Sequence, residues 1–165
     1  MPVIQPPDPV WTGAGNRAAW ILPYRPYRIY HTLVGVLDAT VSELEVQPYP
    51  TEYAPAQVVG TGGNGRTIRA GYPTATWYFP QLTLGQFDQI LTPWHYAERQ
   101  NAGRLYIITR TDVLVSYTHP TSGHQELRYN APIFYAYVRD LTYETGPGVV
   151  KQVQVNFGHL EIAVS

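Results

Sequence analysis

Residues Arg69–Trp94, RAGYPTATWYFPQLTLGQFDQILTPW, set the requirements that the rest of the chain must meet. The first part of this stretch is rich in Thr, Trp, Tyr and Phe, and it predicts an extended strand over 74–79. Thr83 then stands three residues before Gln86, which is the spacing of a helix capping box. The stretch therefore predicts a strand that leads directly into a helix over residues 83–92.

The apolar residues of this helix fall on one side, and Pro93 is expected to end it. They are Leu84, Phe87, Ile90 and Leu91. A helix of about ten residues is not stable alone in water, so this side has to pack on another apolar surface. The rest of the sequence offers a β-sheet for that purpose.

The remaining sequence predicts strands separated by turns. Strands are expected at 28–35, 37–46, 66–70, 104–109, 112–118, 126–129, 133–143, 149–157 and 160–164. Segment 37–46 also fits a short helical turn, with strand favoured. Arg110–Thr111 is predicted to join the strands 104–109 and 112–118 as a hairpin, and Gly-Pro-Gly at 146–148 to turn the chain again. One face of the strand after that turn is expected to carry Val149, Val153, Val155 and Phe157.

This order of elements predicts a mainly β fold, an antiparallel β-sandwich or barrel with one flanking α-helix. Residues 1–27 contain six prolines and are expected to form an extended N-terminal arm. Residues 47–65 are expected to form a long irregular loop with a flexible glycine-rich tip. The remainder, 28–165, has the length of a single domain.

The surface composition favours contact with other proteins. Charged residues make up only 14% of the chain, against about a quarter in typical soluble domains. Fourteen tyrosines and four tryptophans supply side chains that suit half-buried contact surfaces. Trp11 and Trp20, in the arm, are costly to leave in water, so the arm is expected to pack on its own domain or on a neighbouring copy.

Charge and targeting signals exclude several other roles. The net charge is −1, and ten arginines and one lysine are scattered without a run of like charge, so bulk attraction to nucleic acid is not expected. Cysteine is absent, which excludes disulfides and thiolate chemistry. The amino terminus does not resemble a secretory signal, and no apolar run is long enough to span a membrane.

No motif predicts an active site. Gly60, Gly62 and Gly65 match the dinucleotide pattern G-x-G-x-x-G, but no helix is predicted after them, so they indicate a loop tip. His119, His124 and Glu126 are the best metal candidates, yet they flank a Pro/Gly turn where such residues are usually solvated. No serine stands in a G-x-S-x-G setting. We therefore expect a protein that is not an enzyme, with no catalytic, cofactor-binding or metal-binding residues.

Several segments together resemble the tail proteins of tailed bacteriophages, the tail-tube and distal tail proteins. They are GYPTATWYFP leading into LTLGQFDQIL, then RLYIIT, and a closing VKQVQVNF. The resemblance implies a β-sandwich or barrel with one flanking helix and a long extended loop, and subunits that stack as rings around a DNA channel. This chain departs from the pattern because it lacks marked acidity.

The resemblance implies a structural virion protein of the tail, either a tail-tube or a tail-tip component. It would assemble in the host cytoplasm as a ring of copies, expected to be hexameric, with other tail proteins as partners. DNA would only pass through the channel, with no specific nucleic-acid binding and no membrane contact. The predicted subunit-interface residues are Trp11, Trp20, Tyr49, Tyr53, Val58, Val59, Asn64 and Arg66. The alternatives are a glycan-binding β-sandwich module and an accessory virion or host-adhesion protein.

Overall fold

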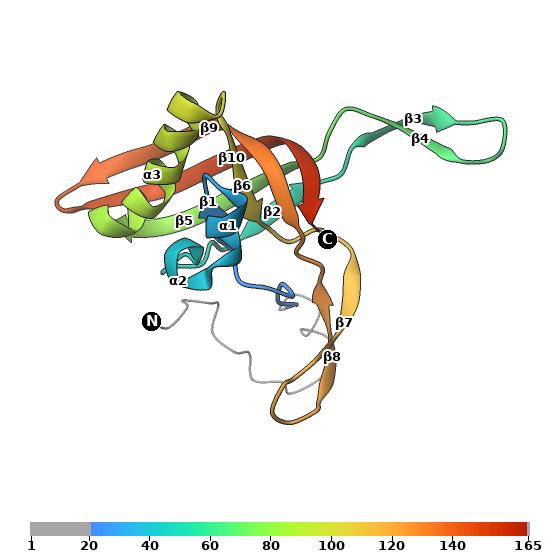
Figure 1. Cartoon of the computed structure of the whole chain (residues 1–165), viewed down its shortest axis with the longest axis horizontal. Helices are drawn as coiled ribbons and strands as arrows, with labels where there is room; N and C mark the ends of the chain where they lie inside the picture. Colours follow the sequence, from blue (N-terminus) through green and yellow to red (C-terminus); the bar gives the residue numbers. More distant parts are fainter. Residues whose placement is uncertain (1–20, 165) are drawn as a thin grey trace.

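Six strands form one antiparallel sheet in the order β1-β6-β9-β10-β5-β2 in the computed structural model, which describes residues 21–164 (Figure 1). Their bounds are β1 (Arg28–Tyr30), β2 (Thr51–Ala54), β5 (Thr74–Thr83), β6 (Arg104–Ile108), β9 (Ile133–Gly146) and β10 (Val149–Val164). Two further pairs, β3 (Gln57–Thr61) with β4 (Thr67–Ala70) and β7 (Leu114–Thr118) with β8 (Gln125–Tyr129), form separate two-stranded ribbons. The predicted mainly β, antiparallel fold with one main helix is confirmed.

The six-stranded sheet is strongly curved, and side chains connect strands that are far apart in its order. Trp77 of β5 donates its indole N–H to Thr109 Oγ1, just after β6, at 3.0 Å, although two strands separate β5 from β6. The Tyr27 hydroxyl lies 2.8 Å from Thr51 Oγ1 and so joins the two outermost strands of the sheet. The sheet is therefore curved like a half-closed barrel around a common core.

Helix α3 (Leu84–Gln100) covers the concave face of this sheet. Its capping box is present as predicted, because the Gln86 N–H donates to Thr83 Oγ1 and the Thr83 N–H donates to Gln86 Oε1. Phe87 and Ile90 are buried in the core cluster, whereas Leu84, expected on the same face, is 60% exposed. The fully buried aromatic side chains beneath the helix are Trp77, Phe79, Phe134 and Phe157.

The helix continues past Pro93, where the sequence predicts its end. Proline costs the helix one backbone hydrogen bond, but Pro93 and Ala97 are both buried and Trp94 packs against the core. Burial of the second half of the helix outweighs the local cost of the proline. The helix ends where Gly103, with a φ of +83°, donates its N–H to the carbonyl of Ala97.

Two short helices replace strand predictions near the amino end. The strand expected at 28–35 stops at Tyr30, and helix α1 (Leu33–Leu37) follows. Segment 37–46, for which strand was favoured, holds helix α2 (Ala39–Ser42). Thr32 accepts a hydrogen bond from the Gly35 N–H and Asp38 accepts one from the Thr40 N–H, so each helix begins at a capping side chain.

The predicted hairpin joined at Arg110–Thr111 is wrong. Strand β6 pairs with β1 and β9, while β7 pairs with β8. Arg110 donates to the Thr51 carbonyl and hydroxyl oxygens, and the Thr111 N–H donates to the Asn130 carbonyl. These bonds direct the chain out of the sheet into the second ribbon.

The predicted turn at 146–148 does join β9 to β10, but β10 contains a bulge. Gln152 has a φ of +52°, and the pairing register shifts between Lys151 and Gln154. Val150 is therefore buried together with Val153, and Val149, expected on that face, is only partly buried.

Candidate assembly surfaces

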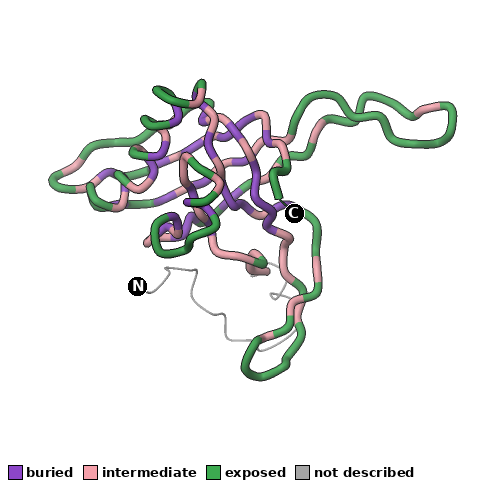
Figure 2. Tube along the Cα trace, in the orientation of Figure 1, coloured by how far each residue is buried: buried purple, intermediate pink, exposed green. Residues whose placement is uncertain are grey.

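The β3–β4 ribbon, residues 57–70, extends from one end of the molecule's longest axis (Figure 1). Every residue of β3 and β4 is exposed (Figure 2), and the two strands pair only with each other. Val58, Val59 and Ile68 are large apolar side chains left in water on this ribbon. The sequence predicts an irregular loop over 47–65 and a strand over 66–70, whereas the structure pairs β3 with β4 in a regular ribbon that leaves the body of the protein.

Glycines and one amide side chain shape the tip of the ribbon. The Gly62 N–H donates to the Arg66 carbonyl, and the Gly65 N–H donates back to the Gly62 carbonyl. Gly65 has a φ of +83°, a conformation that strongly favours glycine. Asn64 Oδ1 accepts a hydrogen bond from the Arg66 N–H at 3.0 Å. The G-x-G-x-x-G match thus lies within a ribbon and its turn, with a strand after it in place of a helix.

Four of the predicted interface residues lie together on this ribbon. Val58 and Val59 are on β3, and Asn64 and Arg66 are at the tip, all exposed. Sequence reasoning missed Ile68, although it is the apolar residue of β4. These positions are all exposed on a single protruding element.

The other predicted interface residues lie elsewhere. Tyr53 is on β2 and packs partly buried toward Phe134, with 6.2 Å between ring centroids. Tyr49 is 46% exposed beside β5, where its N–H donates to the Tyr78 carbonyl. Trp11 and Trp20, and most of the arm predicted for residues 1–27, lie outside the described residues.

The β7–β8 ribbon is a second protrusion. Its strands match those predicted at 112–118 and 126–129, but the first of them was predicted to pair with 104–109. Residues 22–24 run beside its outer strand, because the Tyr24 N–H donates to the Tyr129 carbonyl and the Tyr129 N–H donates to the Leu22 carbonyl. Leu114 and Leu127 are exposed on the ribbon. This ribbon is supported by the chain on one edge, unlike the β3–β4 ribbon.

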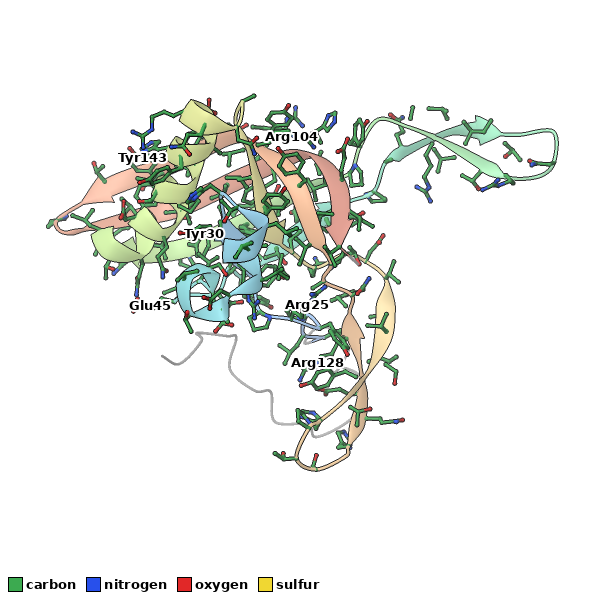
Figure 3. All side chains as sticks on the ribbon, in the orientation of Figure 1. Arg25, Tyr30, Glu45, Arg104, Arg128 and Tyr143 are labelled. Carbon is green, nitrogen blue, oxygen red and sulfur yellow. The ribbon has the colours of Figure 1, made fainter. Side chains whose placement is uncertain are left out.

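The metal candidates of the sequence meet on the β7–β8 ribbon as an ion-pair cluster. His119 Nε2 lies 3.0 Å from Glu126 Oε1, and Arg128 Nη2 lies 2.8 Å from the same oxygen. Burial raises the pKa of Glu126, but the hydrogen bond and charge of Arg128, with a contribution from His119, outweigh it and lower that pKa. The Arg128 guanidinium also covers the Tyr117 ring at 3.7 Å (Figure 3).

His124 belongs to the same turn, with its ring centroid 5.7 Å from that of His119. Within residues 21–164, no group of three His, Cys, Asp or Glu side chains is arranged to hold a metal ion. In the same range, no helix is both long and apolar enough to cross a membrane.

A groove of about 400 Å³ lies between α2 and α3, and we call it the helical groove. Its lining includes His31, Val41, Asp88 and Tyr96. The His31 ring is stacked between Tyr30 and Tyr96, with centroid distances of 4.4 and 4.6 Å. His31 Nδ1 is buried and has no hydrogen-bond partner, and burial lowers the pKa of this histidine. The groove thus offers a carboxylate, that of Asp88, beside aromatic and aliphatic surface.

The convex face of the sheet carries a row of aromatic side chains. Tyr106 and Tyr135 stack at 4.7 Å, and Arg104 lies 4.0 Å above the Tyr135 ring. Further along, Tyr72 stacks on His159 at 3.6 Å beside a hollow of about 320 Å³. Arg104 also forms an ion pair with Glu161 at 3.1 Å, and this hydrogen bond is the main cause of the lowered pKa of Glu161. Most of these side chains therefore make their contacts with one another.

Comparison with known proteins gives little further guidance. Searches against protein families and against curated proteins find no match. Among solved structures, the chain is similar to the SPP1 tail tube, determined by solid-state NMR and cryo-EM, with a TM-score of 0.36 and 13% sequence identity. The likeness covers 85% of this chain and 77% of that chain.

Proposed function

We propose that this protein is a non-enzymatic structural subunit that assembles with copies of itself through the β3–β4 ribbon. The observation that supports it is the exposure of every residue of β3 and β4, including Val58, Val59 and Ile68. A two-stranded ribbon is at best marginally stable in water, and its free edges offer backbone groups for pairing with another chain. A neighbouring copy that covers the ribbon would stabilise it and would pair its free edges.

The position of the ribbon favours a head-to-tail arrangement. The ribbon occupies one end of the molecule, so the surface that receives it on the next copy is a different surface. Repeated heterologous contacts of this kind close into rings when the rotation between copies allows it. A ring is therefore the assembly that we propose.

We place this ring in the tail of a bacteriophage, as a tail-tube or tail-tip component with other tail proteins as partners. The support is the sequence resemblance carried by residues 69–94 and the closing strand. DNA would pass through the ring without specific contacts, and six copies per ring is the number that the resemblance implies. The protein would be found in the virion tail after assembly in the host cytoplasm.

The test is to remove the ribbon and follow assembly. Residues 57–70 are replaced by a short Gly-Ser turn, and purified wild type and variant are compared by electron microscopy and sedimentation. We expect rings or tubes from the wild type and a folded monomer from the variant. A matched control shortens the turn at 119–124 of the other ribbon and should still assemble. A wild type that stays monomeric at high concentration would refute the proposal.

A glycan-binding module is the second candidate, favoured by the hollow beside Tyr72. Tyr72 stacks on His159 and keeps its other face exposed, and Tyr137 and Arg139 line the same hollow. Exposed aromatic faces next to polar groups suit sugar rings. The test is binding to a glycan array. Loss of binding in Tyr72→Ala, with binding kept in Tyr143→Ala on the β9–β10 hairpin, would support this candidate over the structural one.

A further inference from the structure

Opposite charges are separated in the part of the chain between Arg28 and Arg99. The only arginine or lysine residues there are Arg66 and Arg69, and both belong to the β3–β4 ribbon. The ribbon itself, residues 57–70, contains no acidic residue. The acidic residues of the same interval lie outside the ribbon: Asp38, Glu43, Glu45, Glu52, Asp88 and Glu98. The ribbon is therefore a positively charged, apolar projection.

Four of those acidic residues lie on or next to the two helices that form the helical groove. Asp88 lines it, and Asp38 and Glu43 stand at the two ends of α2. Glu45 is joined to α3, because its Oε1 accepts a hydrogen bond from Gln86 Nε2 at 3.2 Å. In Figure 3, Glu45 lies on the helical side of the molecule, away from the β3–β4 ribbon. The Arg28 guanidinium is directed at the Val36 and Leu37 carbonyls beside this surface.

Exposed aliphatic side chains lie on α1 and on the two helices that form the groove, where Val41 is one of the lining residues. Val34 and Leu37 on α1, Val41 on α2 and Leu84 at the start of α3 are all exposed, Val34 by 79%. Exposed apolar groups that gather beside a groove mark an interaction surface. His31, which lines the groove, has a buried Nδ1 with no hydrogen-bond partner among the described residues.

We propose that the helical groove of one copy receives the β3–β4 ribbon of the next copy. Val58, Val59 and Ile68 would cover the exposed aliphatic residues of α1, α2 and α3. Arg66 and Arg69 would face Asp88 and the acidic residues around it. The occupant is assigned by charge complementarity, since the basic ribbon meets an acidic, apolar groove. This inference rests on the proposed function and names its acceptor surface.

The contact has to form between copies. The ribbon and the helical groove lie toward opposite ends of the molecule (Figure 1). Among the described residues, β3 and β4 pair only with each other. A ribbon that cannot reach its own groove makes a heterologous contact, the geometry required for a ring.

Cysteine cross-linking tests the contact directly because the chain has no cysteine of its own. The double variant Val59→Cys with Val41→Cys is assembled, oxidised and run on a denaturing gel. We expect a ladder of covalent oligomers that disappears on reduction. The matched control, Val59→Cys with Leu114→Cys on the β7–β8 ribbon, should give no ladder. Each single-cysteine variant controls for pairing between identical positions.

Charge reversal tests the electrostatic part. Arg69→Glu and Asp88→Arg should each raise the concentration needed for assembly by about tenfold or more, and the two together should restore much of it. Lys151→Glu makes the same change in charge at the β9–β10 turn and should leave assembly unchanged. If the double variant does not regain assembly at lower concentration, the proposed pairing of Arg69 with Asp88 is wrong.

The outcomes separate this inference from the proposed function. If the wild type assembles but the ladder appears only in the control pair, the ribbon docks elsewhere and the groove is not its acceptor. The same conclusion follows if deletion of residues 2–20 makes the groove residues newly accessible to a chemical probe while assembly persists. If the wild type does not assemble at all, the proposed function itself fails.

Discussion

At the scale of single residues, Tyr27 joins the two outermost strands of the curved sheet. Its hydroxyl lies 2.8 Å from Thr51 Oγ1, and its N–H donates to the buried Gln47 side chain. Burial raises the pKa of Tyr27 from 10.0 to about 12, partly opposed by the hydrogen bond to Thr51. The folded protein therefore holds this phenol in its neutral form.

This shift predicts an alkaline loss of stability. Because the folded pKa lies above the unfolded value, the contribution of Tyr27 is complete below pH 10.0 and is lost as the pH rises toward about 12. Tyr27→Phe should lose this pH dependence, and it should lower the free energy of unfolding at neutral pH by about 1 kcal/mol. Denaturant unfolding across that pH range checks the prediction. An identical alkaline profile in the variant would contradict it.

Trp77 and Thr109 provide a second test of the curved sheet. The indole N–H of the fully buried Trp77 has its hydrogen-bond acceptor in Thr109 Oγ1. Thr109→Val should leave this donor unsatisfied and lower the free energy of unfolding by about 1–3 kcal/mol. Thr118→Val, on an exposed position of the β7–β8 ribbon, is the matched control and should have little effect. Equal stability of the two variants would show that the hydrogen bond across the sheet is not formed.

At the scale of elements, the capping box at Thr83 starts the helix that covers the core. Thr83→Ala removes the side chain that accepts the Gln86 N–H and should cost about 1 kcal/mol of stability. Thr92→Ala, inside the same helix, should be neutral or slightly stabilising because alanine has the higher helix propensity. Both are measured by chemical denaturation in the ribbon-deleted background, where assembly does not interfere. A Thr83→Ala protein as stable as Thr92→Ala would refute the role of the cap.

The ion-pair cluster on the β7–β8 ribbon predicts sensitivity to acid. The pKa of Glu126 is lowered from 4.5, so its contribution is complete above about that pH and is lost as the pH falls through the lower, folded value. Glu126→Gln should destabilise the ribbon at neutral pH, and its difference from the wild type should shrink in acid. Amide hydrogen exchange of residues 114–129 measures this, with Gln125→Ala as the control. A difference that stays constant with pH would contradict the prediction.

Local signals in the sequence were sufficient for some elements and insufficient for others. The capping box at Thr83, the turn at 146–148 and the alternation in β9 and β10 are short-range patterns, and the structure contains them. The end of α3 and the partner of β6 depend on burial and on pairing with distant residues, which no local pattern encodes. Pro93 is the clearest example, since packing of the following turn on the core decides the outcome.

The features of the candidate site were likewise only partly predictable from the sequence. The glycines of 60–65 predict a projecting tip, and that tip carries Asn64 and Arg66 as expected. The strand predicted at 66–70 matches β4, but no local pattern indicates that 57–61 pairs with it, because β3 and β4 show no buried face. The helical groove was missed because it forms between α2 and α3, which are far apart in the chain. The segregation of Arg66 and Arg69 from the acidic residues was readable in the sequence.

At the scale of the whole molecule, the protein has a well-packed curved sheet and two ribbons that leave it. The core is closed by its own side chains, whereas the β3–β4 ribbon has no partner within the described residues. An element of this kind is expected to open readily by itself and to become ordered on contact. We propose that other copies of this protein supply that contact.

Amide hydrogen exchange of the β3–β4 ribbon, before and after assembly, tests this claim most directly. In dilute protein, residues 57–70 should exchange rapidly while the core strands are protected. In assembled protein the same amides should become protected, together with those around the helical groove. Exchange of the ribbon that remains equally fast after assembly, or that is already slow in the isolated subunit, would contradict the account.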